Sequence, residues 1–164
     1  MKKILLCLIL LFPALGMAQS DISSENCLKA ISIFKEDPLS QKADRALSYV
    51  FIFADKSPDV LVGVKVDYFP WNEEVTPSKV KNKLLGAYIA GNVEFQLQHN
   101  VNADHPYQGV LLMLDTYIKM KTAGEVEPMP GLEEWLKLKA DKKLESKILK
   151  IQQTESDDGT LKST

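Results

Sequence analysis

The two histidines of this chain are the residues most suited to chemistry, and Asp104 stands beside the second. His99, Asp104 and His105 all fall in the segment 96–109. Imidazole and carboxylate groups can bind zinc or transfer protons. A zinc site would need all three to converge with a fourth ligand, and the six-residue spacing lacks the shared helix face of an H-x-x-x-H pair. We therefore favour a structural role and keep a metal or hydrolytic site at His99 and His105 as the alternative.

The structural interpretation makes this segment the turn between two helices. His99 would close the first helix, where a partly cationic ring interacts favourably with the dipole. Asn100 can adopt the left-handed conformation that ends a helix. Asp104 would cap the second helix, and Pro106 suits its first turn. Each polar residue thus has a local structural role, and we predict no metal ligands and no cofactor.

Cys27 is the other candidate for reactivity. It falls in the expected first turn of a helix, where free amide donors favour a thiolate. A free cysteine otherwise behaves as a small hydrophobic residue and is usually buried. We predict burial, with an intermolecular disulfide as the alternative.

Local catalytic motifs are missing from the chain. The sequence contains no G-x-S-x-G, H-E-x-x-H or C-x-x-C pattern and no phosphate-binding glycine loop. Catalytic triads need no local signature, so this lowers the weight of an enzymatic function without excluding it. We predict no catalytic residues.

The N-terminus has the features of a signal peptide covering residues 1–18. Lys2 and Lys3 precede an apolar run at 4–12, too short to span a bilayer, and small residues lead to Ala18. We expect cleavage after Ala18 and a soluble periplasmic or secreted protein; a retained anchor is the alternative. Loss of the two lysines would take the net charge from −2 to −4. Nucleic acid is therefore an unsuitable partner.

Apolar periodicity predicts a mainly α fold, a single compact helical domain of about five helices. The expected core domain is 19–121, followed by a linker at 122–131, a docked amphipathic helix at 132–152 and a disordered tail at 153–164. The expected helical segments are 23–37, 37–57, 78–100, 105–121 and 132–152.

Several side chains are assigned positions within these helices. Ser24, Asp37 and Thr76 are capping candidates, the last two because proline follows them. Gly86 and Gly91 interrupt a nearly all-apolar helix, which costs about 1 kcal/mol each relative to alanine unless another helix approaches closely. The following helix should turn inward these residues: Val110, Leu111, Leu114, Tyr117 and Ile118. Trp135 should dock the C-terminal helix, although its lysines also suit an anionic membrane surface.

One segment, residues 59–71, does not follow a helical pattern. Valines alternate from Val60 to Val66, which predicts an extended connector. It could cross the helices, or its edge could pair with a second copy and form a homo-oligomer. Tyr68, Phe69 and Trp71 at its end are candidate anchors for a partner protein. Their alternative role is to plug one end of the helical core.

Together these features predict a small exported helical protein of the bacterial envelope that binds another envelope or secreted protein without catalysis. An immunity-like, inhibitor-like or adaptor role fits its size and export signal, which many small periplasmic proteins share. That likeness is one of class, with no motif behind it. The alternative function is a small periplasmic hydrolase or metal-binding protein using His99 and His105.

Overall fold

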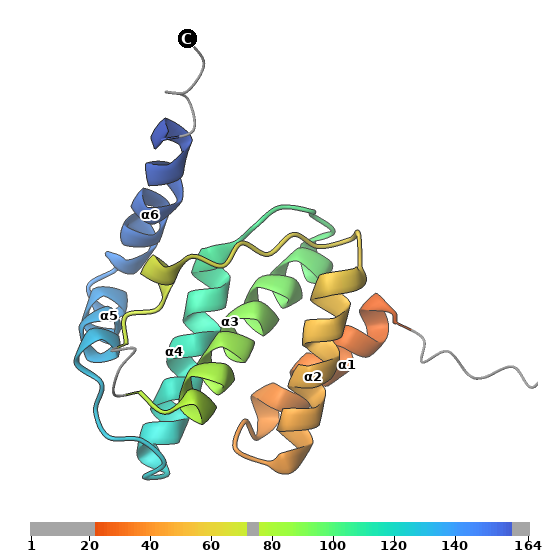
Figure 1. Cartoon of the computed structure of the whole chain (residues 1–164), viewed down its shortest axis with the longest axis horizontal. Coiled ribbons are helices and arrows are strands. Elements are labelled where there is room, and N and C mark those ends of the chain that lie inside the picture. Colours follow the sequence, from red (N-terminus) through yellow and green to blue (C-terminus); the bar gives the residue numbers. More distant parts are fainter. Residues whose placement is uncertain (1–21, 72–75, 159–164) are drawn as a thin grey trace, which may run out of the picture.

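The computed structural model describes residues 22–71 and 76–158 and shows a mainly α fold, as predicted (Figure 1). The predicted signal peptide at 1–18 and the last residues, 159–164, lie outside the described part. The helices within it are α1 Ser24–Glu36, α2 Gln41–Lys56, the 3-10 turn η1 Val66–Tyr68, α3 Ser78–His99, α4 Pro106–Thr122, α5 Pro130–Ala140 and α6 Leu144–Asp158. No strand occurs in these two described ranges.

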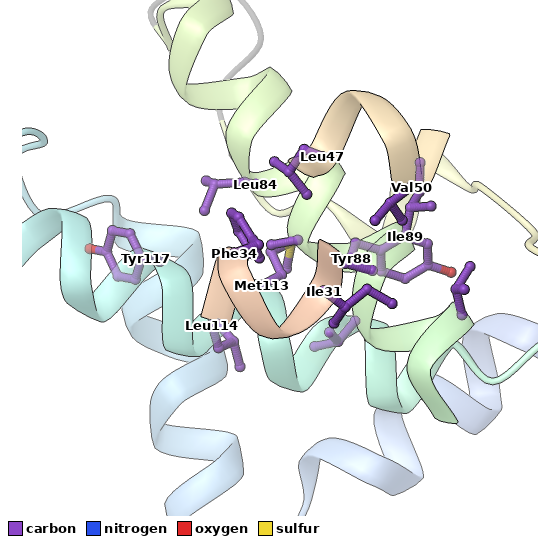
Figure 2. Close-up of a cluster of buried hydrophobic side chains, with 14 of the residues drawn as sticks. Ile31, Phe34, Leu47, Val50, Leu84, Tyr88, Ile89, Met113, Leu114 and Tyr117 are labelled. Atoms are coloured by element: carbon purple, nitrogen blue, oxygen red, sulfur yellow. The ribbon is translucent and has the colours of Figure 1, made fainter. Parts of the chain in front are cut away.

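Helix α3 is the centre of the molecule, with α2 on one side and α4 on the other (Figure 1). It forms an antiparallel pair with α4, as the short turn after His99 predicted. Its side chains are buried on nearly every face, so it lacks the polar stripe of a surface helix. Figure 2 shows apolar side chains from α1, α2, α3 and α4 meeting in one core. They include Ile31, Phe34, Leu47, Val50, Leu84, Tyr88, Ile89, Met113, Leu114 and Tyr117.

The two glycines of α3 lie where neighbouring helices come closest, which confirms the explanation offered for them. A Cβ added at Gly86 would stand 2.7 Å from Cδ1 of Leu47 in α2. One added at Gly91 would stand 2.6 Å from the backbone oxygen of Gln108 in α4. The absence of side chains at both positions therefore lets α2 and α4 pack tightly on α3.

Three helix starts differ from those predicted. Helix α1 is capped by Ser23, one residue before Ser24, and Ser23 Oγ accepts a hydrogen bond from Asn26 N (3.3 Å). Helix α2 is capped by Ser40 rather than Asp37, because Asp37 to Ser40 form a preceding turn. Helix α3 begins after Pro77 with no side-chain cap, so Thr76 is not its cap.

A buried lysine holds the turn between α1 and α2. Lys83 of α3 is only 6% exposed, and its Nζ donates to the Pro38 carbonyl oxygen (2.7 Å) and to the Asp44 carboxylate. A buried charge is costly unless it is paired and hydrogen-bonded, as it is here. The polar contacts of Lys83 thus fix the turn that contains Pro38.

The predicted C-terminal helix is divided in two. Helices α5 and α6 are separated at residues 141–143, where Lys142 has a positive φ of 58°. Trp135 is 3% exposed and Ile148 fully buried, so both helices are docked, as expected. Two other expectations were wrong: Ile118 is 38% exposed rather than inward, and α6 continues to Asp158 into the predicted tail.

Candidate functional site

The extended connector is held on the helices by side chains that take the place of a neighbouring strand. Gln96 Oε1 accepts from Leu61 N (2.8 Å), and Gln96 Nε2 donates to Leu61 O (2.7 Å). Two residues on, Gly63 N donates to Asp104 Oδ1 (3.0 Å) and Gly63 O accepts from Tyr88 Oη (2.6 Å). Alternate residues of an extended chain direct their backbone groups to the same side, so both Leu61 and Gly63 face α3. The connector therefore runs across the helices without a sheet.

The turn between α3 and α4 carries His99 and His105, and we call it the histidine turn. It belongs to the same polar network. Asn92 is fully buried; its Nδ2 donates to Asp104 Oδ1 (2.6 Å), and its Oδ1 accepts from Gln96 Nε2 (2.7 Å) and His105 N (3.1 Å). Asp104 was expected to cap α4, and this was wrong. Helix α4 has no side-chain cap, and Asp104 reaches the connector and α3 instead.

The side chains of His99 and His105 both pack against the ring of Phe95. The rings of His99 and His105 lie 4.0 and 4.4 Å from the centroid of Phe95. His99 Nδ1 is also 2.8 Å from Phe95 O, and Asn100 ends α3 with a left-handed φ of 52°, as predicted. Within the described ranges, no group of three or more His, Cys, Asp or Glu side chains could hold a metal ion.

Cys27 is fully buried in the core between α1 and its neighbours, which confirms the predicted burial. Burial raises the pKa of its thiol to about 12, because a thiolate would lose its hydration there. The thiol therefore stays protonated and inert at neutral pH.

The three aromatic residues at the end of the connector occupy different environments. Tyr68 is fully buried and stacks on Tyr88, with ring centroids 5.7 Å apart. Phe69 packs edge-on against Tyr88 and stacks on Trp71, with ring centroids 4.9 Å apart for the second pair. Tyr68 thus serves the core, and Phe69 links it to Trp71, which reaches a surface cleft.

This cleft, which we call the Trp71 cleft, has a volume of about 690 Å³. That lies within the range of about 300–1,000 Å³ common for ligand sites. Its walls come from three stretches of the chain: the connector end, the start of α3, and the segment between α4 and α5. The lining residues are Pro70, Trp71, Thr76, Pro77, Val80, Glu125, Val126, Glu127, Pro128, Met129, Pro130 and Gly131.

One wall of the Trp71 cleft is fixed from α4. Tyr117 Oη accepts from Met129 N (2.8 Å) and donates to Glu133 Oε1 (2.5 Å). Lys121 Nζ donates to the same carboxylate oxygen at 2.5 Å. The hydrogen bonds from Lys121 and Tyr117 hold the pKa of Glu133 below its usual range, so the carboxylate stays charged. Burial and the bond to Glu133 raise the pKa of Tyr117 to about 12.

The opposite wall approaches α5 through a glycine. A Cβ added at Gly131 would stand 1.8 Å from the Pro70 carbonyl oxygen, so only glycine allows this contact. The sequence identified residues 122–131 as a linker and did not identify them as a site. The signal present was the repeated proline on either side: Pro70, Pro77, Pro128 and Pro130.

Comparison of the chain with protein-family models, with curated proteins and with solved structures finds no match. Among the helices of the described residues, none combines the length and the apolar composition that crossing a membrane requires. The proposed function therefore rests on the geometry of the Trp71 cleft.

Proposed function

We propose that this protein is a non-catalytic binding module that takes an apolar segment of another protein into the Trp71 cleft. One observation carries the proposal: a cleft of about 690 Å³ whose walls are predominantly proline, valine, methionine and tryptophan. Clefts of this size lined by apolar side chains are the usual form of a binding site. Trp71 supplies the large aromatic surface that commonly dominates binding energy.

The contacts that hold the cleft walls support the same proposal. Its walls are held by the Tyr117 hydrogen bonds on one side and by the Gly131 contact with Pro70 on the other. A preformed site loses little conformational entropy on binding, so more of the contact energy appears as affinity. Phe69 supports Trp71 from behind, whereas Tyr68 is buried and is not part of the proposed contact surface.

The proposed setting is the bacterial envelope, with the partner another envelope or secreted protein. The support is the signal-like segment at 1–18, so we expect the mature protein to begin at Gln19. Intact-mass measurement of the exported protein tests this: a retained Met1 or an added acyl chain would contradict it. An immunity, inhibitor or adaptor role would each use the same cleft.

Affinity capture from a periplasmic extract of the source bacterium tests the binding role. The native chain should retain a specific protein, and Trp71→Ala should lose it while keeping the helical circular dichroism spectrum. Ile52→Ala is a matched control, since Ile52 is an exposed apolar residue on α2, 46% exposed. Capture that survives Trp71→Ala, or that Ile52→Ala also abolishes, would contradict the proposal.

The alternative functions gain less support. Neither hydrolysis nor metal binding at His99 and His105 is favoured by the contacts of these side chains, which pack on Phe95. Pairing of the connector edge with a second copy stays a prediction; Leu61 and Val64 are exposed there, at 58% and 55%. Sedimentation of the purified protein over a range of concentrations would test that pairing.

A further inference from the structure

The charged residues that line the described part of the Trp71 cleft are all acidic. Glu125 and Glu127 are both exposed at its rim, and among the lining residues that the structure describes there is no lysine, arginine or histidine. The third polar lining residue, Thr76, is neutral and only 8% exposed. Any occupant of the apolar floor therefore meets two carboxylates and no compensating cation in the described part of the lining.

The two rim carboxylates also have no ion-pair partner among the described residues. The nearby acid Glu133 is already used, since Lys121 and Tyr117 both bind it. Glu125 and Glu127 make no such contact with another described side chain. Two uncompensated carboxylates beside an apolar surface attract a cationic group, and they repel or desolvate unfavourably against an acidic one.

The backbone beside these carboxylates favours a peptide as the occupant. The backbone N–H groups of Val126 and Glu127 make no hydrogen bond with other described residues, whereas Met129 N is bound by Tyr117. An extended partner segment can pair its own carbonyl groups with such free donors. The cleft then offers apolar walls for side chains and carboxylates at the rim, and the segment that carries these carboxylates has two free backbone donors.

We infer that the segment bound in the Trp71 cleft is basic as well as apolar, with lysine or arginine flanking its buried side chains. This inference rests on the proposed function and specifies the chemistry of the partner. Exposed charge pairs contribute modestly to affinity, so two such pairs should favour a basic segment about twofold to thirtyfold over a neutral one.

The experiment titrates the full mature protein into three dye-labelled peptides and follows fluorescence anisotropy. The peptides share the same apolar residues and carry lysine, glutamine or glutamate at the flanking positions. The basic peptide should bind most tightly and the acidic one least. Raising the salt from about 0.01 M to about 1 M shortens the Debye length from about 30 Å to about 3 Å, so it should remove most of the preference.

Charge reversal within the cleft is the decisive variant. Glu125→Lys with Glu127→Lys should reverse the order, so that the acidic peptide binds most tightly. The matched control is Glu36→Lys with Asp55→Lys, which changes the net charge equally at exposed positions on α1 and α2. This control should keep the native preference, since it leaves the cleft unchanged.

The outcomes separate the inference from the proposed function. Equal affinity for all three peptides, lost on Trp71→Ala, would overturn the inference and leave the apolar binding role standing. A preference that the control variant also reverses would overturn the inference, because overall charge would then explain it. Failure of every peptide to bind would contradict both the inference and the proposed function.

Discussion

The side-chain amide of Gln96 forms two hydrogen bonds with the backbone of Leu61, one to its N–H (2.8 Å) and one to its carbonyl (2.7 Å). This arrangement reproduces the pairing that a neighbouring strand would provide. It lets an extended segment with valine alternation lie on a helical protein that shows no strand between residues 22 and 71 or between 76 and 158.

Gln96→Ala should destabilise the fold by about 1–3 kcal/mol, because Leu61 loses both partners and Asn92 loses one. The free energy of unfolding from urea titration measures this, and the Leu61 amide should exchange faster with solvent. Gln98→Ala is the matched control, since Gln98 is exposed on the same helix. Equal effects of the two substitutions would show that the pairing contributes no stability.

The two glycines of α3 allow the same substitution, glycine to alanine, to be compared at positions that contact different neighbours. Alanine gains up to about 1 kcal/mol over glycine in a helix, but overpacking costs about 1–3 kcal/mol. Gly91→Ala meets the backbone oxygen of Gln108, which cannot move aside, so we expect net destabilisation. Gly86→Ala meets the end of the flexible Leu47 side chain and should cost less. Denaturation midpoints in the opposite order would contradict this packing.

Cys27 gives a prediction with a defined pH window. Its pKa rises from an ordinary 9.0 to about 12 in the folded protein, so the unfolded chain loses this proton first as the pH increases. The contribution of the thiol to stability is therefore complete below pH 9 and declines from pH 9 toward 12. The difference in unfolding free energy between the native chain and Cys27→Ala should shrink over this window. A constant difference would contradict the burial of the thiol.

The histidine turn gives a prediction about metal. Protein purified without a histidine tag should lack stoichiometric zinc, and a chelator should leave its melting temperature unchanged. His99→Gln should cost less than about 1 kcal/mol, as expected for an exposed helix end. Asn92→Ala should cost more, because it leaves buried partners unsatisfied. One equivalent of zinc, lost on either His99→Gln or His105→Ser, would support the alternative function.

The sequence was sufficient for features set by local periodicity. The central burial of α3, its glycine contacts and the left-handed Asn100 all follow from patterns within a few residues. Helix starts were less accurate, because Ser23 and Ser40 compete with equally suitable neighbours as caps. The break before α6 was not predicted, since Lys142 adopts a positive φ without a glycine or proline to signal it.

The site depended on contacts that no local pattern reveals. Asp104 was assigned to the nearest helix, but it binds Gly63, 41 residues away. Trp71 was a candidate anchor for a partner, with a plug of the helical core as the alternative, whereas residues 125–131 that line the cleft with it belong to a segment predicted only as a linker. Proline spacing predicts where a chain turns and gives no information on which turns meet.

The proposed binding role of the Trp71 cleft is tested most directly by site-specific photo-cross-linking in the living bacterium. A photoreactive aromatic residue would replace Trp71 in one strain and Ser32, an exposed residue of α1, in another. We predict a discrete adduct from position 71 that is missing from position 32, with the cross-link mapping to an apolar segment of one partner. No adduct from position 71, or the same adducts from both positions, would contradict the proposal that this cleft binds a partner.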